Sequence, residues 1–131
     1  MGKNLHHSIL KFFFARMGEH DAVSDLSVVG HDAEFLYRIR RDRFGDEFTV
    51  WLSDAYHFTE ADLYNKPNEI GANDYIIIGK PEGGFNLDYD LIKQEQIGVG
   101  KIGKFMGAIN LPEPWRFLDE YEREKLGIRR L

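Results

Sequence analysis

The sequence predicts an α/β domain of three layers, in which a small mixed β-sheet is flanked by helices. Two observations support this prediction. In the first half, apolar and polar residues alternate over 33–41, and a second strand over 48–53 follows a polar connection, so a β-hairpin is expected. In the second half, the apolar run 74–79, a helix over 88–96 and the short strand 97–99 form a strand–helix–strand unit. Such units are typical of parallel strands that are covered on both faces.

The composition indicates one soluble domain over residues 1–131. The chain is 43% hydrophobic and 14% aromatic, and no apolar run approaches the roughly 20 residues of a membrane-spanning helix. The absence of cysteine excludes a disulfide, a thiolate metal site and a cysteine nucleophile. The net charge of −5 differs from that of a strongly basic nucleic-acid-binding protein, so nucleic-acid binding would need a local basic patch. We expect a cytoplasmic protein.

The first helix is predicted over residues 5–17, where apolar residues recur at helical spacing and Gly18 supplies an end. Residues 22–29 are ambiguous and are compatible with a short strand. In the hairpin, Tyr37 and Ile39 share one face, whereas Arg38 and Arg40 share the other. The second hairpin strand is expected to place its apolar residues against the first face and Trp51 among the arginines.

Three further helices are predicted from their ends. Thr59 is suited to begin a helix of about two turns before Pro67. Another helix is expected over 101–109. The last is expected over 115–126, packed on the body and ended by Gly127.

The densest basic cluster lies around the hairpin connection. It consists of Arg38, Arg40, Arg41 and Arg43, with Trp51 expected alongside. Guanidinium groups contact phosphates and an aromatic ring can stack on a base, so these five residues form a candidate nucleic-acid-binding surface. The alternative, which we favour, is a solvated face on which neighbouring carboxylates pair with the arginines.

A G-x-G-x-x-G pattern runs from Gly98 through Gly100 to Gly103, between a predicted strand and a predicted helix. In dinucleotide sites these glycines let a pyrophosphate approach the backbone. Here the pattern comes late in the chain, so we favour glycines that allow close packing. Weak anion binding by Gly98, Gly100, Lys101 and Lys104 at the helix start is the alternative.

The order helix, antiparallel hairpin, helix, strand, helix, strand, helix resembles the restriction-endonuclease-like fold. The part from Asp74 to Ile109 is similar to the non-catalytic half of Mrr-type nucleases, and the resemblance covers roughly residues 5–110 as a pattern of elements. Active members of that family hold Mg²⁺ with an acidic residue on one strand and an acid-x-Lys motif on the next. The second hairpin strand, Phe48-Thr-Val-Trp-Leu-Ser53, offers no such motif, so the resemblance implies a catalytically degenerate member.

Four carboxylates are expected at strand ends, and they form the candidate metal site of an active enzyme: Asp32, Glu34, Glu47 and Asp54. We favour solvated turn residues at these positions, and Mg²⁺ is expected only if the chain is an active nuclease. Three functions stay open. The leading one is a degenerate nuclease-like domain that binds nucleic acid or a protein partner. The others are an active metal-dependent nuclease, and a protein-interaction module that forms a homodimer through the apolar N-terminal helix.

Overall fold

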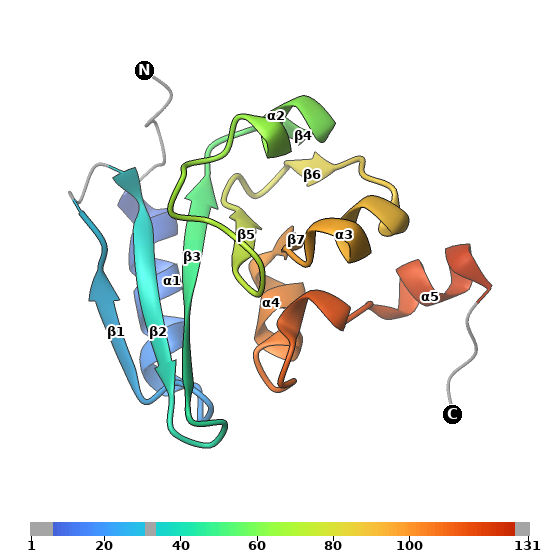
Figure 1. Cartoon of the computed structure of the whole chain (residues 1–131). Helices are drawn as coiled ribbons and strands as arrows, with labels where there is room; N and C mark the ends of the chain where they lie inside the picture. The colour runs from blue at the N-terminus through green and yellow to red at the C-terminus, as the bar shows by residue number, and fades with distance from the viewer. Residues whose placement is uncertain (1–6, 31–33, 128–131) are drawn as a thin grey trace.

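The computed structural model describes residues 7–30 and 34–127. In this part of the chain, five strands form one mixed sheet in the order β1-β2-β3-β5-β7 (Figure 1). Strand β2 pairs antiparallel with both β1 and β3, whereas β5 pairs parallel with both β3 and β7. The strands are β1 (Asp25–Val28), β2 (Leu36–Arg41), β3 (Asp46–Ser53), β5 (Tyr75–Ile78) and β7 (Gly98–Lys101). The predicted hairpin and the predicted parallel unit are therefore both present.

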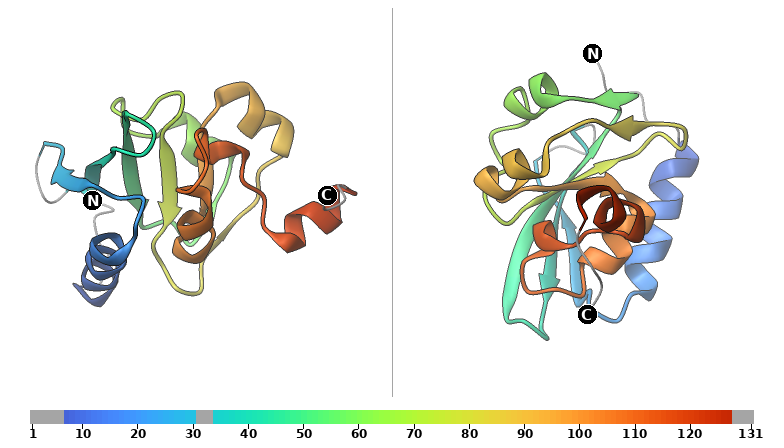
Figure 2. Two further views of the ribbon diagram at one scale, coloured as in Figure 1. Left: turned by 90° about the horizontal axis from the view of Figure 1, so that it is seen from below. Right: turned by 90° about the vertical axis from the view of Figure 1, so that its right-hand side faces the viewer.

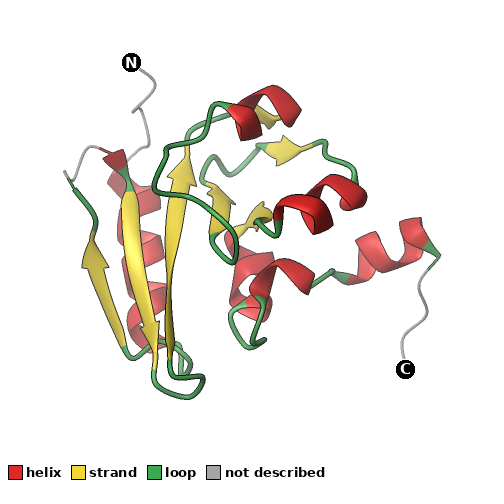
Figure 3. Cartoon of the chain, viewed as in Figure 1, coloured by secondary structure: helices red, strands yellow, loops and turns green. Residues whose placement is uncertain are grey.

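Helices cover both faces of this sheet, which confirms the three-layer α/β prediction (Figures 2 and 3). One face packs against α1 (His7–Glu19) and α4 (Ile102–Ala108). The other packs against α2 (Glu60–Tyr64) and α3 (Tyr89–Glu95). A small parallel sheet of β4 (His57–Phe58) and β6 (Gly84–Phe85), which the sequence did not indicate, lies on this second side.

Two separate hydrophobic cores hold the layers together. The core beneath α1 and α4 includes Phe13, Val50 and Phe105, whereas the core on the opposite face includes Leu63 and Ile76. All four residues of β5 are buried, because it lies between β3 and β7 and is covered on both sides. This position explains why its sequence is an unbroken apolar run.

The hairpin register follows the predicted alternation. Tyr37 lies opposite Val50 and Ile39 opposite Phe48 on the buried face, whereas Arg38 lies opposite Thr49 on the other. Loop residues 54–56 and 65–74 then lead the chain to the second half of the sheet. No helix in the described ranges is long and apolar enough to cross a membrane.

Several predicted boundaries were wrong. Helix α1 runs through Gly18 to Glu19, so Gly18 does not end it. By contrast, the ambiguous segment 22–29 contains the edge strand β1, in agreement with the short strand considered for it. The predicted helix 115–126 is split: Trp115 belongs to the 3₁₀ turn η2 (Pro114–Arg116), and α5 (Glu120–Leu126) begins only at Glu120.

Helix α5 also does not pack closely on the body as predicted. None of its residues is buried, and a hollow of about 610 Å³ lies between it and the segment around β6 and α3. Figure 1 shows α5 standing away from the sheet. An ion pair of 2.9 Å between Lys104 and Glu122 attaches it. The predicted end is confirmed, since Gly127 closes the helix with a φ of 74°.

Candidate functional site

The face of β2 that is turned away from α1 carries two of the predicted arginines. Arg38 and Arg40 are exposed there because they alternate with buried residues of β2. Trp51, on the same face of β3, is only half-buried, and its ring packs edge-to-face on Phe58 at 6.1 Å between centroids. Three of the five predicted nucleic-acid-binding residues thus share a surface, because alternate residues of a strand point to the same face of the sheet.

Carboxylates balance the charge of this surface. Arg38 pairs with Glu47 at 3.5 Å, and Arg40 pairs with Asp42 at 3.1 Å and with Asp25 at 4.0 Å. These exposed pairs are worth little for stability. They do reduce the positive potential that would attract a nucleic acid, which agrees with the alternative favoured from the sequence.

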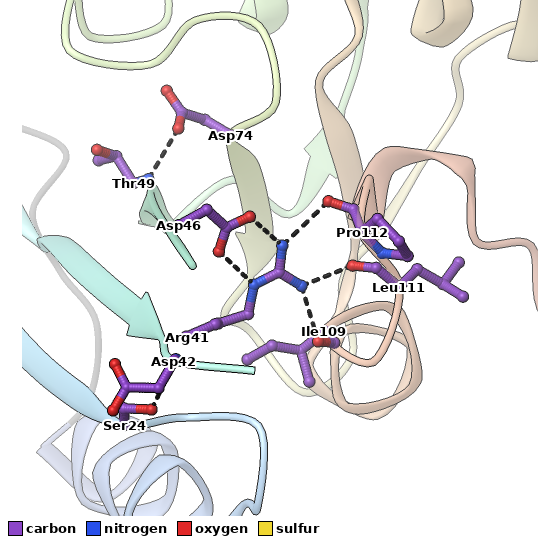
Figure 4. A network of polar contacts seen from close by, with 9 residues as sticks. All are labelled: Ser24, Arg41, Asp42, Asp46, Thr49, Asp74, Ile109, Leu111 and Pro112. Carbon is purple, nitrogen blue, oxygen red and sulfur yellow. Dashed lines mark hydrogen bonds and ion pairs between the residues drawn. The ribbon is translucent and has the colours of Figure 1, made fainter. Parts of the chain in front are cut away.

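Arg41 does not belong to this surface, because it is 1% exposed and points to the opposite face (Figure 4). Its guanidinium donates two hydrogen bonds to Asp46, of 3.0 and 2.7 Å. It also donates to three backbone carbonyls of the segment after α4, at 2.9, 2.6 and 3.0 Å: those of Ile109, Leu111 and Pro112. Arg41 is therefore a structural anchor that ties this segment to the hairpin, and it is unavailable to a ligand.

Arg43 also lies apart from Arg38 and Arg40. It is exposed in the hairpin turn and lines a shallow hollow with Arg16 and His20, which come from the α1 side of the sheet. The predicted cluster is consequently divided among three places. Only Arg38 and Arg40 remain as neighbouring exposed arginines.

Two of the three glycines in the pattern serve packing, whereas a Cβ atom on Gly103 would meet nothing within 4 Å. Gly98 and Gly100 lie within β7, beside β5, and a Cβ atom on Gly98 would lie 2.3 Å from the ring of Tyr75. A Cβ atom on Gly100 would lie 3.0 Å from the Tyr75 hydroxyl. Gly98 and Gly100 thus make room for a buried tyrosine ring, which agrees with the close packing favoured from the sequence.

The two lysines of the predicted anion site have structural partners as well. Lys104 Nζ donates to the carbonyl of Val99 and to Glu122, both at 2.9 Å, and Lys101 Nζ donates to the carbonyl of Pro81 at 2.9 Å. Helix α4 has only seven residues. Lys104 is therefore committed to holding α5, whereas Lys101 is exposed and keeps two of its three N–H groups for other contacts.

The predicted carboxylates do not fit one metal ion. Glu47 lies near the start of β3 and Asp54 follows its end, so an extended strand of about 20 Å separates them. Glu34 lies at the same end as Asp54, since Leu52 N–H donates to the carbonyl of Phe35. Asp32 lies outside the described residues. Among the described residues, no group of three or more His, Asp or Glu side chains is placed to hold a metal.

Asp74 is a partly buried carboxylate that the sequence analysis did not single out. It accepts hydrogen bonds of 2.8 Å from the backbone N–H groups of Thr49 and Gly71, and so joins β3 to the loop before β5. Burial raises the pKa of Asp74 above its usual value of 3.8, although these hydrogen bonds and Arg38 oppose the shift. The sequence signal that could have identified Asp74 is its position directly before an apolar strand.

The outer edge of β1 has no strand partner among the described residues. Within residues 7–30 and 34–127, the strand that pairs with β1 is β2 (Figure 1). Val29 N–H donates to the carbonyl of Leu36, so alternate residues of β1 turn their backbone groups toward β2. Leu26 and Val28 have the opposite parity, and their N–H and C=O groups therefore point away from the sheet.

Apolar side chains accompany this edge. Val28 is 45% exposed and lies opposite Tyr37, and Phe14 of α1 packs edge-to-face on the same tyrosine at 5.3 Å and is 41% exposed. Leu26, on the same face, is half-buried. β1 carries no lysine or proline, and the features that limit edge pairing are its length of four residues and the charge of Asp25.

A cavity of about 490 Å³ lies at the carboxyl ends of β3, β5 and β7, beneath the first half of α1. Its walls are mainly apolar and include Ile9, Phe12, Leu52 and Ile77. In open α/β sheets, ligands commonly bind outside the carboxyl ends of the parallel strands. The sequence analysis missed this cavity, because its walls come from four separate segments.

Comparison of the chain with known protein families, with curated proteins and with solved structures found no match.

Proposed function

We propose that this chain is a non-catalytic interaction domain that pairs with a second copy of itself through the edge strand β1. The observation that carries the proposal is the unpaired edge, where the backbone groups of Leu26 and Val28 point away from β2. Such an edge is a ready template for another strand. A second copy is favoured as the occupant because one antiparallel contact satisfies the same edge in both chains.

The sequence of β1 is compatible with such a two-fold pairing. With Ser27 opposite Ser27 of the second copy, Leu26 lies opposite Val28 in two symmetric pairs. Leu26 and Val28 are the residues whose backbone groups point outward, so each pair exchanges two hydrogen bonds. Both side chains lie on the α1 face, where they pack across the strands, and the two Asp25 carboxylates stay apart.

This contact differs from the homodimer predicted through the N-terminal helix. The apolar face of α1 is occupied, because Phe13 and Met17 are buried against the sheet. Phe14 is the residue of α1 that adds exposed apolar area beside β1. The helix therefore contributes to the proposed interface from its side, and the strand provides the backbone contacts.

The strand order bears on the kinship of the domain, and the sequence of β3 supports a non-catalytic domain. The strand order, with an antiparallel β1–β3 followed by parallel β5 and β7, is compatible with the proposed kinship with restriction-endonuclease-like domains. The end of β3, however, carries Trp51, Leu52 and Ser53 in place of an acid-x-Lys motif, and Glu47 lies far from Asp54. An active nuclease is therefore the less favoured proposal.

The charge of the sheet face that carries Arg38 and Arg40 favours a protein over a nucleic acid as partner. Arg38 and Arg40 are matched there by Asp25, Asp42 and Glu47, and the whole chain is acidic. If nucleic acid binds this face, replacing both arginines with alanine will weaken binding and flatten its salt dependence. A mobility-shift assay with single- and double-stranded DNA and RNA, with and without Mn²⁺, tests both nucleic-acid binding and cleavage.

The dimer is tested by sedimentation velocity of the full chain from about 5 to 500 µM. Each backbone hydrogen bond is worth only about 1 kcal/mol net, so we expect a dissociation constant in the micromolar range. Val28→Pro removes an outward N–H group without touching the bonds to β2, and Val28→Lys places a charge in the apolar pair. Both changes are expected to give monomers.

Val28→Thr is the matched control, because it keeps the branched shape and the backbone N–H. We expect it to retain dimerisation, and circular dichroism will verify that all three variants keep the fold. A wild-type chain that is monomeric at the highest concentration contradicts the proposal. So does a dimer that persists in both disruptive variants.

A further inference from the structure

The cavity beneath α1 has the shape and charge of a small-molecule site. Its volume of about 490 Å³ falls within the range of roughly 300–1,000 Å³ that is usual for ligand pockets. It opens where three parallel strands end, and neither β1 nor Phe14, which form the proposed dimer contact, is among its lining residues. Its occupant is therefore a question separate from the homodimer.

The apolar walls of the cavity favour a ligand that is largely apolar. Leu52 and Ile77 form the sheet side, Ile9 and Phe12 the α1 side, and Ile102 the α4 side. Phe12 is 45% exposed, although it lies beside this hollow. A hydrophobic ligand in the cavity would remove this apolar surface from water, which is the usual driving force for binding in such a site.

The polar groups of the lining favour an anionic head. They are few, and among the described residues the charged ones are two cations, Lys80 and Lys101, with no Asp or Glu in the lining. One N–H of Lys101 Nζ is held by the carbonyl of Pro81, and this contact leaves two donors for a ligand. Two lysines without a lining carboxylate are notable in a chain of net charge −5.

We propose that this cavity binds a small amphiphilic anion, with its apolar chain between α1 and the sheet and its carboxylate at Lys80 and Lys101. The apolar walls would recognise the chain, and the two ammonium groups would recognise the charge. A cationic amphiphile of the same length lacks the complementary head and is excluded by the lysines.

The test is isothermal titration calorimetry of the full chain with three probes of equal chain length. These are decanoate, 1-decanol and decyltrimethylammonium, each at up to about 1 mM, since weaker affinities would not mark a specific site. We expect decanoate to bind more tightly than 1-decanol, and the cation not to bind. No binding of decanoate, or equal binding of the cation, overturns the proposal.

Variants then locate the site. The double change Lys80→Gln and Lys101→Gln is expected to weaken decanoate binding by about tenfold or more, because both charge-assisted contacts are lost. Lys93→Gln on α3 removes an exposed lysine far from the cavity and is the matched control. Gly103→Leu adds a side chain at a lining position where a Cβ meets nothing within 4 Å, so we expect it to compete with the ligand.

Each variant is checked for its fold by circular dichroism before titration. Unchanged decanoate affinity in the double lysine variant, or an equal loss in Lys93→Gln, places the binding elsewhere and overturns the assignment. The sedimentation behaviour of the same variants should equal that of the wild type, because the cavity does not include β1. Failure of this proposal is thereby distinguishable from failure of the proposed dimer.

Discussion

Replacing Arg41 with methionine tests the conclusion that this arginine anchors the chain. Methionine keeps an unbranched apolar stem against the rings of Phe44 and Phe48, over which the guanidinium lies at 4.3 and 4.9 Å. It removes every donor, so Asp46 and the carbonyls of the segment after α4 lose their partners. The change therefore isolates the hydrogen-bond network from the packing.

The expected loss is large. An unsatisfied buried acceptor costs about 1–3 kcal/mol, and breaking a buried ion pair costs about 3–5 kcal/mol. Asp46 is 37% exposed and can be rehydrated, which reduces its share. We expect Arg41→Met to lower the free energy of unfolding by about 3–5 kcal/mol, a large part of the roughly 5–15 kcal/mol of a typical domain.

Urea unfolding followed by circular dichroism measures this loss. Arg38→Met is the matched control, because Arg38 is half-exposed and its pair with Glu47 spans 3.5 Å at the surface, so a change within about 0.5–1 kcal/mol is expected. A cost below about 1 kcal/mol for Arg41→Met, or equal costs for the two variants, would refute the anchoring role.

Three further predictions concern the sheet, and each is measured by urea unfolding. Gly98→Ala should lower the free energy of unfolding by about 1–3 kcal/mol, because its Cβ would meet the Tyr75 ring. Gly103→Ala should be neutral or stabilising, because its Cβ would meet nothing within 4 Å. Equal costs for the two variants would contradict the packing role. Tyr75→Phe should not destabilise the fold, because the buried hydroxyl has no hydrogen-bond partner among the described residues; a loss above about 1 kcal/mol would reveal one. The folded-state pKa of Asp74 is raised, so the folded chain binds this proton more tightly than the unfolded chain. Wild-type stability relative to Asp74→Asn should therefore increase as the pH falls from 7 toward the usual pKa of 3.8, and the opposite trend would contradict the shift.

The basic cluster shows where residue type alone misleads. Arg40 and Arg41 are adjacent in the sequence, yet one is exposed and the other is buried. Strand parity was a sufficient signal, because Arg41 falls on the same face as Tyr37 and Ile39. What parity did not reveal is the set of acceptors, since the carbonyls that Arg41 binds lie about 70 residues later in the chain.

The glycine pattern of β7 illustrates the same limit. Its spacing is equally compatible with a phosphate-binding turn and with close packing. The choice depends on which side chain lies over the glycines, and Tyr75 of the neighbouring strand fills that space. A residue on another strand cannot be assigned to that space from local sequence.

The sequence by itself determined the class of the fold, the hairpin and the strand–helix–strand unit. Alternation in the hairpin and the wholly apolar β5 reflect which faces are buried, and this pattern can be recognised within each strand's own sequence. The tertiary structure alone decided the strand order, the free edge of β1 and the cavity at the strand ends. These features arise between segments distant in the chain, and their formation depends on how those segments pack in three dimensions.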